Sequence, residues 1–264
     1  MPVHVYEAAH AFAEIGAGVS FGPNSLWAMT LIDPAIRAGF DKRATHNAYR
    51  EKEGTFFDFR HGMDGPHGQA GQLITGEVKA EGGRLASIHR AHFLEELVKL
   101  VPSGCASFGK RVEEVHEVEG GVRLRFHDGS SAEASAVVGC DGIKSRVRAV
   151  LLGAESSAAH ARFTGKYAYR GLIPMTKAVA ALGDELARNS QMYLGYGGHL
   201  LTFPIEKGEL MNVVAFRTKA DGKWEDEKWV LPMRKEDMAA DFKDWGASVK
   251  TVLSLMEKPD LWAL

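Results

Sequence analysis

The most informative stretch of the chain is Val137-Val138-Gly139-Cys140-Asp141-Gly142-Ile143-Lys144-Ser145-Arg146-Val147-Arg148. A short apolar run stops at Asp141-Gly142, and a basic segment follows it. This pattern predicts a buried strand that ends in a carboxylate and a flexible backbone, and open α/β sheets bind ligands just beyond such strand ends. The basic side chains suit a polyanion. An ordinary Asp-Gly turn before a solvated basic helix would give the same pattern, so the surrounding sequence has to distinguish the two.

The composition is that of a folded globular protein. The chain has 264 residues, of which 45% are hydrophobic and 25% are charged, which is typical of one or two domains with a sizeable core. A formal net charge of −2 gives no overall field that would attract nucleic acid or anionic lipid, so we expect no nucleic-acid partner. The apolar stretches are too short to cross a bilayer, so we expect no transmembrane segment.

The compartment is predicted from the first residues and the cysteines. Met1-Pro2-Val3-His4 lacks the basic start and long apolar core of a signal peptide. The two cysteines, Cys105 and Cys140, form no CxxC or zinc pattern and no disulfide framework. Reduced thiols are typical of an intracellular protein, and we expect a cytoplasmic one.

The N-terminal segment has features of a dinucleotide-binding fold. Val3 to Tyr6 alternates as a β-strand does, Glu7 closes it, and Gly16-Ala17-Gly18 follows. A carboxylate at a strand end can accept hydrogen bonds from ribose hydroxyls, and Gly16 and Gly18 would let the backbone approach a flat ligand closely. A Gly-x-Gly pair alone is weak evidence. Residues 23–39 predict a packing helix that is interrupted at Pro34, with Asn24 or Ser25 as its N-cap.

Residues 87–100 predict a second helix, with Ser87 as its cap and Arg90 in its first turn. An arginine at this end opposes the helix dipole by about a few tenths of a kcal/mol. An anion bound next to Arg90 would offset this unfavourable interaction. A solvated arginine is the equally weighted alternative.

Residues 112–118 and 121–126 predict an antiparallel ribbon that leads into the strand before Asp141. The resulting order of strand, helix, helix, ribbon and strand departs from the strand-helix rhythm of a nicotinamide dehydrogenase. It favours a flavin-binding fold.

The histidine-rich loop from His61 to Gly71 suggests a metal site at first sight. Its candidate ligands are His61, Asp64 and His67, but no regular element fixes their geometry. We interpret them as solvated loop side chains and assign no metal ligands.

The order of these motifs resembles single-component FAD-dependent aromatic hydroxylases, with the salicylate hydroxylase-like branch as the nearest. Several spaced motifs in one order are far more specific than a single glycine pair. The resemblance covers nearly the whole chain and rests on these segments: Glu7, Gly16 to Gly18 with Pro23-Asn24, His89-Arg90, Asp141-Gly142 with Ser145 and Arg148, residues 167–174 and residues 199–216.

The resemblance implies which residues bind the cofactors. Glu7 matches the position that binds the adenosine ribose, Gly16 and Gly18 a loop beside the flavin, and Arg90 an arginine that contacts FAD. Asp141-Gly142 matches the segment thought to serve both the FAD pyrophosphate and NAD(P)H. These positions are therefore the candidate cofactor-binding residues.

In the substrate region, Arg170 resembles an active-site arginine and is the candidate catalytic residue. An arginine on an exposed sheet surface is the alternative interpretation. Phe203 stands where relatives commonly have tyrosine. Because phenylalanine has no hydroxyl to hydrogen-bond a phenol, the family's means of orienting the substrate is missing at this position.

The resemblance implies an α/β, or mixed α+β, architecture: a Rossmann-like FAD-binding domain of the aromatic-hydroxylase type with a β-sheet substrate domain. We expect the partial, discontinuous FAD domain in residues 1–44 and 81–155, and the partial substrate domain in residues 45–80 and 156–264. Between residues 235 and 258, apolar residues recur at helical spacing with a break at Gly246, which predicts core helices.

The implied reaction is hydroxylation of a small aromatic acid or phenol with O₂. NAD(P)H reduces FAD, and a flavin C4a-hydroperoxide delivers the oxygen. The family's first strand with its phosphate-binding Gly-x-Gly-x-x-Gly turn, and its later Gly-Asp segment, have no match in the chain. We therefore expect a chain truncated at both ends, lacking the first βα unit, that binds FAD weakly or not at all. A non-catalytic fragment and a small-aromatic-binding remnant remain alternatives.

Overall fold

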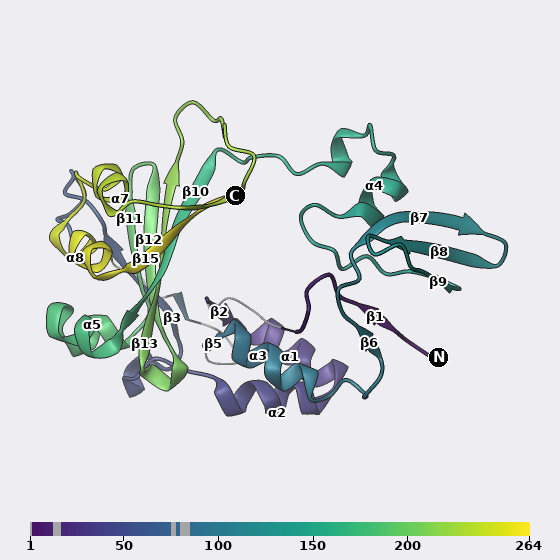
Figure 1. The fold of residues 1–264 in the computed structure, drawn as a ribbon. Helices are drawn as coiled ribbons and strands as arrows, with labels where there is room; N and C mark the ends of the chain where they lie inside the picture. The colour runs from purple at the N-terminus through teal and green to yellow at the C-terminus, as the bar shows by residue number, and fades with distance from the viewer. Residues whose placement is uncertain (1, 13–16, 75–77, 80–84) are drawn as a thin grey trace. The chain divides into compact units, whose positions relative to one another are not determined.

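The computed structural model describes residues 2–12, 17–74, 78–79 and 85–264 (Figure 1). The chain divides into two compact units, which are described separately below. Unit 1 comprises Met1–Ala13 and Val98–Arg162, and unit 2 comprises Glu14–Leu97 and Phe163–Leu264. Within the described ranges, no helix has the length and apolar character needed to cross a membrane.

Unit 1 consists mainly of short strands. Strand β1 pairs in parallel with β6, and the predicted ribbon is present as the antiparallel strands β7, β8 and β9. The bounds are β1 Val5–Tyr6, β6 Ala106–Ser107, β7 Val112–Val118, β8 Gly121–Phe126, β9 Ser131–Ala134, helix α4 Arg146–Leu152 and the 3₁₀ turn η2 Ser157–Ala159.

The strand expected before Asp141 is absent from the structure, so that prediction is wrong. Residues 135–144 form no strand, and Val138 is 85% exposed. A strand needs a neighbouring strand to satisfy its backbone N–H and C=O groups. No described segment pairs with these residues. Apolar sequence alone therefore does not make a strand here.

The first part of unit 2 is a small helical layer. Strand β2 pairs antiparallel with β5, and the interruption predicted at Pro34 separates two helices. The bounds are β2 Gly18–Phe21, α1 Pro23–Ile32, α2 Pro34–Arg43, η1 Arg50–Lys52, β5 Ala86–His89 and α3 Arg90–Val98.

The helix caps differ from those expected. Helix α1 starts directly after Gly22 with Pro23 at its first position and has no side-chain cap, so Asn24 and Ser25 lie inside the helix. Proline suits that position because its missing N–H is not needed there. Ser87 lies within β5, so it does not cap α3.

Among the described residues of unit 2, eight strands form a mixed sheet in the order β14-β15-β10-β13-β12-β11-β3-β4. Only the β3–β11 pair is parallel within this described sheet. The bounds are β3 Thr55–His61, β4 Val78–Lys79, β10 Lys166–Pro174, β11 Gln191–Gly195, β12 Gly198–Ile205, β13 Leu210–Thr218, β14 Val230–Pro232 and β15 Glu257–Ala263.

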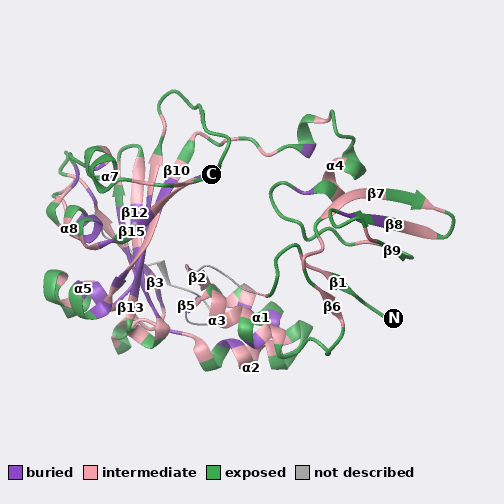
Figure 2. Cartoon of the chain, in the orientation of Figure 1, coloured by how far each residue is buried: buried purple, intermediate pink, exposed green. Residues whose placement is uncertain are grey.

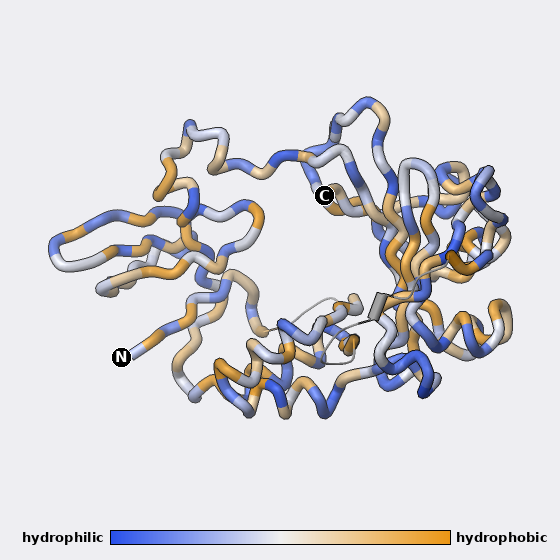
Figure 3. Tube along the Cα trace, turned by 180° about the vertical axis from the view of Figure 1, so that it is seen from behind, coloured by the Kyte–Doolittle hydropathy of each residue, from blue (hydrophilic) through white to orange (hydrophobic). Residues whose placement is uncertain are grey.

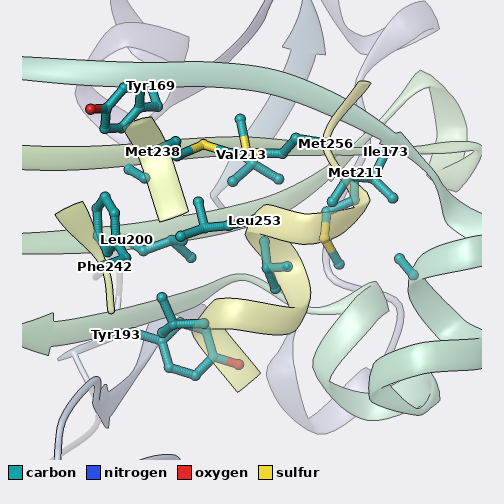
Figure 4. Packing of buried hydrophobic residues seen from close by; sticks show 14 of the residues in the cluster. Tyr169, Ile173, Tyr193, Leu200, Met211, Val213, Met238, Phe242, Leu253 and Met256 are labelled. Carbon is teal, nitrogen blue, oxygen red and sulfur yellow. The ribbon is translucent and has the colours of Figure 1, made fainter. Parts of the chain in front are cut away.

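One face of this sheet, here called the helix face, carries the main hydrophobic core. It is covered by α5 Met175–Leu182, α6 Asp184–Arg188, α7 Lys235–Asp241 and α8 Ala247–Leu255. Strand residues such as Ile173, Met211 and Val213 contact Met238 and Leu253 from the helices (Figure 4). The buried, apolar residues run along these strands (Figures 2 and 3).

Because successive side chains of a strand point to opposite faces, the alternate residues of β10, β12 and β13 form a second face. We call it the site face. It carries Arg170, Asn212 and Phe203, and a smaller apolar cluster of Phe57, Leu85, Phe203 and Ile205 lies at one end of it.

The structure confirms the mixed α/β class and the predicted break at Gly246, which separates α7 from α8. The compact units divide the chain after residues 13, 97 and 162. The assignment of residues 1–44 and 81–155 to an FAD domain, and of residues 45–80 and 156–264 to a substrate domain, stays a prediction.

Candidate functional site

Arg170 lies in the middle of the site face on β10. Its cross-strand neighbours are Val214 on β13 and Asp260 on β15. The guanidinium carbon lies 5.1 Å from the ring centre of Trp262, within cation–π range. The Nε atom is buried and has no hydrogen-bond partner, and no carboxylate in the described part of the chain forms an ion pair with Arg170.

Arg90 brings a second positive charge toward Arg170. It is the first residue of α3, and its backbone N–H donates to the carbonyl of Ala17 at 3.0 Å. Burial, and to a smaller extent the charge of Arg90, lower the pKa of Arg170. Arg170 is partly buried whereas Arg90 is exposed. A partly buried guanidinium that a second one repels favours the binding of an anion, because the anion offsets the positive charge.

Gly18 closes this site from strand β2. Its backbone N–H donates to Asn212 Oδ1 at 2.8 Å. A Cβ atom at residue 18 would lie 2.8 Å from the Asn212 side chain, so glycine is required by this close contact. The Asn212 Nδ2 atom is buried without a hydrogen-bond partner, which leaves one donor available at the site face. Gly16 lies outside the described residues.

Phe203 is buried on the site face, where it packs with Phe57, Leu85 and Ile205. The part of the site face that a tyrosine hydroxyl would make polar is therefore apolar in this chain. A bound ring would meet aromatic and aliphatic carbon here.

Glu7 and Asp141 belong to unit 1, where local contacts already use part of their hydrogen-bonding capacity. Glu7 follows β1 and accepts a hydrogen bond from the amide of Ala9 at 2.8 Å. The Asp141 carboxylate accepts from the hydroxyl of Ser145 and from the amides of Arg146 and Val147 at the start of α4. Ser145 is the N-cap of that helix, and Asp141 satisfies two further amides of its first turn.

These contacts change the acidity of Asp141. Partial burial raises the pKa of the carboxyl, but the hydrogen bonds from Ser145, Val147 and Arg146 outweigh that effect and lower the pKa. Gly142 has φ of +74°, and a Cβ atom at this residue would meet no other atom within 4 Å. The turn after Asp141 therefore needs glycine for its backbone conformation rather than for space.

The structure thus brings Gly18, Arg90 and Arg170 together in unit 2. Glu7, Asp141 and Gly142 lie in unit 1. Their convergence with Arg90 around one dinucleotide stays a prediction.

Comparison with known proteins identifies relatives over the whole chain. No family model matches. A 6-methylsalicylate 1-monooxygenase from Aspergillus terreus is 43% identical over 268 residues, which covers 100% of this chain and 59% of the relative. An FAD-dependent monooxygenase from Aspergillus niger is 42% identical over 271 residues, covering 100% and 60%.

A solved salicylate hydroxylase substrate complex has a TM-score of 0.78 and 39% identity, covering 94% of this chain and 60% of that one. The chain belongs to the FAD-dependent monooxygenase family that includes salicylate hydroxylase. It spans about 60% of the length of the curated relatives that it matches.

In this family member, the site residues of unit 2 have the donors and charges that an anionic flavin cofactor or an aromatic acid needs. The buried, unpartnered Arg170 Nε and Asn212 Nδ2 atoms are donors, and Arg90 and Arg170 supply positive charge. An N–H donor and a cation match the carbonyl, phosphate and carboxylate oxygens of such ligands.

Sequence reasoning missed two residues of the site face, Asn212 and Trp262. Asn212 had a detectable signal, because it is a polar residue inside the apolar run Leu210 to Phe216. Trp262 had none, because only the pairing of β15 with β10 brings it beside Arg170.

Proposed function

We propose that the protein is an FAD-dependent monooxygenase that hydroxylates a small aromatic acid or phenol, with NAD(P)H as reductant. The observation that carries this proposal is the Arg170 guanidinium, which is partly buried beside Trp262 with an unpartnered Nε atom. The named relative that acts on 6-methylsalicylate and the solved salicylate hydroxylase complex support an aromatic carboxylic acid as the substrate class.

The chain's own residues have three roles in this proposal. Arg170 binds the carboxylate or phenolate of the substrate, and Trp262 contacts the ring. The apolar side chains of Phe203 and Leu172 keep water away from the reacting ring. Arg90 and Gly18 lie on the cofactor side, where Arg90 offsets the negative charge of the bound flavin nucleotide.

When bound, FAD supplies the redox chemistry that activates O₂. Overall, one oxygen atom of O₂ is inserted into an aromatic C–H bond. The other oxygen leaves as water, with two electrons from NAD(P)H and a proton from solvent. In unit 1, Glu7 is proposed to bind the ribose, and Asp141-Gly142 the pyrophosphate and NAD(P)H.

A second function is binding of a small aromatic acid without turnover. It is supported by the buried Nε atom of Arg170, which has no hydrogen-bond partner. The anion-binding features around Arg170 do not depend on redox chemistry, so they would suit a binding protein equally well.

To test the proposal, the protein is mixed with FAD, with NADH or NADPH, and with salicylate or 6-methylsalicylate. Hydroxylated product is then measured by mass spectrometry. Product with an oxygen atom from ¹⁸O₂ supports the monooxygenase. Saturable binding of salicylate without product supports the second function. Neither product nor binding would contradict both.

A further inference from the structure

A histidine pair and a carboxylate meet beside the site, where β5 and α3 adjoin the corner after β12. His89 ends β5, and His92 lies one turn further along in α3. Glu206 begins the 3₁₀ turn η3, Glu206–Gly208, directly after β12. The three ligand atoms lie within 4.8 Å of one another.

The distances between the candidate ligand atoms are near those of a metal site. His92 Nδ1 lies 3.2 Å from Glu206 Oε1, and His89 Nδ1 lies 3.9 Å from the same oxygen. Zinc ligands at about 2.0–2.1 Å from a common ion are about 3.3–3.4 Å apart in tetrahedral geometry. The His92–Glu206 distance already has this spacing, whereas the His89–Glu206 distance is longer, so side chains must turn toward the ion to place all three ligands around it.

One of the three candidate ligand atoms is buried and lacks a hydrogen-bond partner. His89 Nδ1 is buried and forms no hydrogen bond, although the side chain as a whole is 14% exposed. A buried ring nitrogen without a partner costs stability, and a metal ion would satisfy it. His92 and Glu206 are 30% and 26% exposed, so an ion can reach the group from solvent.

The backbone at Glu206 forms a constrained turn. Glu206 has φ of +53°, and so does Lys207, which is uncommon for residues other than glycine. The amide of Lys207 donates to Thr45 Oγ1 at 2.8 Å, and the amide of Glu209 donates to the carbonyl of Glu206 at 3.1 Å. These contacts fix the backbone that presents Glu206 to the two histidines.

We propose that His89, His92 and Glu206 bind a divalent transition-metal ion, with Zn²⁺ as the representative. Two imidazoles and one carboxylate leave a coordination position for solvent, as in zinc sites with three protein ligands. The ion joins the start of α3 to the corner after β12 and so restrains the helix that begins with Arg90. This proposal does not rest on the monooxygenase activity.

The test titrates ZnCl₂, and CoCl₂ as a spectroscopic probe, into chelator-stripped protein. We expect one high-affinity ion per chain, visible Co²⁺ absorption of a four-coordinate N/O site, and a thermal midpoint that rises with Zn²⁺ and falls again on chelation. Since loss of an outer-shell contact already weakens metal sites about 10–100-fold, His92→Gln and Glu206→Gln should each weaken Zn²⁺ binding at least tenfold.

The matched control is His127→Gln. His127 is an exposed histidine whose Nδ1 atom lies 2.6 Å from Glu113 Oε1, with the same type of histidine–glutamate pair but in unit 1. It should leave Zn²⁺ affinity unchanged. Far-UV circular dichroism of the metal-free variants checks that both ligand variants fold, and the more exposed His92 makes its glutamine variant the safer of the two.

Two results would overturn the proposal. One is parent protein that takes up no stoichiometric Zn²⁺. The other is folded His92→Gln and Glu206→Gln proteins that bind Zn²⁺ as tightly as the parent, which would assign the ion to other surface histidines.

Discussion

Arg170 is the residue on which the proposed chemistry depends most. Its burial, its neighbour Arg90 and its unpartnered Nε atom all make the isolated guanidinium unfavourable. A carboxylate ligand removes this cost, so the affinity for an aromatic acid should depend strongly on this side chain.

We predict that Arg170→Ala weakens the binding of salicylate about ten- to hundredfold, since a hydrogen bond to a charged group contributes about 1.5–3 kcal/mol. Isothermal titration calorimetry measures this. The control is Arg217→Ala, which also removes a guanidinium that lies over an aromatic ring, that of Phe242 in the helix-face core. Equal affinity in the two variants would show that Arg170 does not bind the acid.

Gly18 permits a second test. Gly18→Ala should destabilise unit 2 by about 1–3 kcal/mol, because the new methyl group would overlap the Asn212 side chain. Adding Asn212→Gly removes the overlapping atoms, so the double variant should be less destabilised than the sum of the single ones, by about 0.5–3 kcal/mol. Urea denaturation of the four proteins measures this coupling, and simple additivity would contradict the close contact.

Asp141 gives a prediction about pH. Its pKa in the folded protein is lowered from an ordinary value of 3.8, so the stability that it contributes is present above that value and is lost as the pH falls through the folded pKa. Hydrogen exchange of the Arg146 and Val147 amides should therefore be slower in the parent than in Asp141→Asn at about pH 6, well above both values. The difference should shrink as the pH is lowered below 3.8. A constant difference down to the lowest pH would exclude the carboxylate as the cause.

At the scale of elements, the helix face of the sheet provides most of the apolar burial in unit 2. Leu253 of α8 is 3% exposed within this core, whereas Leu31 of α1 is 67% exposed. Leu253→Ala should reduce the free energy of unfolding by about 2–5 kcal/mol, and Leu31→Ala by no more than about 0.5 kcal/mol. Thermal or urea unfolding compares the two, and similar losses would contradict the packing of α8 on this face.

Elements with a local cause were predictable from the sequence. Pro34 and Gly246 break helices because proline lacks an N–H and glycine favours helix ends, and both breaks are present. The ribbon of β7 and β8 followed from alternation of apolar residues. By contrast, the strand predicted at Val137 to Gly139 needs a partner strand, and no property of the apolar run itself supplies one.

The site was predictable only in part, for the same reason. Arg90 and Arg170 were found from motifs, but spacing along the chain does not predict that the fold brings them close enough for the charge of Arg90 to lower the pKa of Arg170. The group of His89, His92 and Glu206 joins residues more than a hundred positions apart, so spacing along the chain gives no sign of it. The apparent histidine cluster from His61 to His67 was more visible in the sequence than the group that the fold assembles.

At the scale of the whole molecule, we propose that the two units bind different parts of the ligands. Unit 2 contains the sheet, the apolar ring environment and the two arginines of the proposed substrate and flavin side. Unit 1 contains Glu7 and Asp141, which we propose to bind the nucleotide part of FAD. Above all, we propose that the site face of the sheet binds the aromatic acid at Arg170 and Trp262.

Nuclear magnetic resonance tests this claim most directly. Protein labelled at the arginine Nε and tryptophan indole positions is titrated with salicylate in the presence of FAD. We predict saturable shifts of the Arg170 and Trp262 signals that disappear in Arg170→Ala and persist in Arg217→Ala. Saturable shifts confined to the helix face, or unchanged salicylate affinity in Arg170→Ala, would contradict the account.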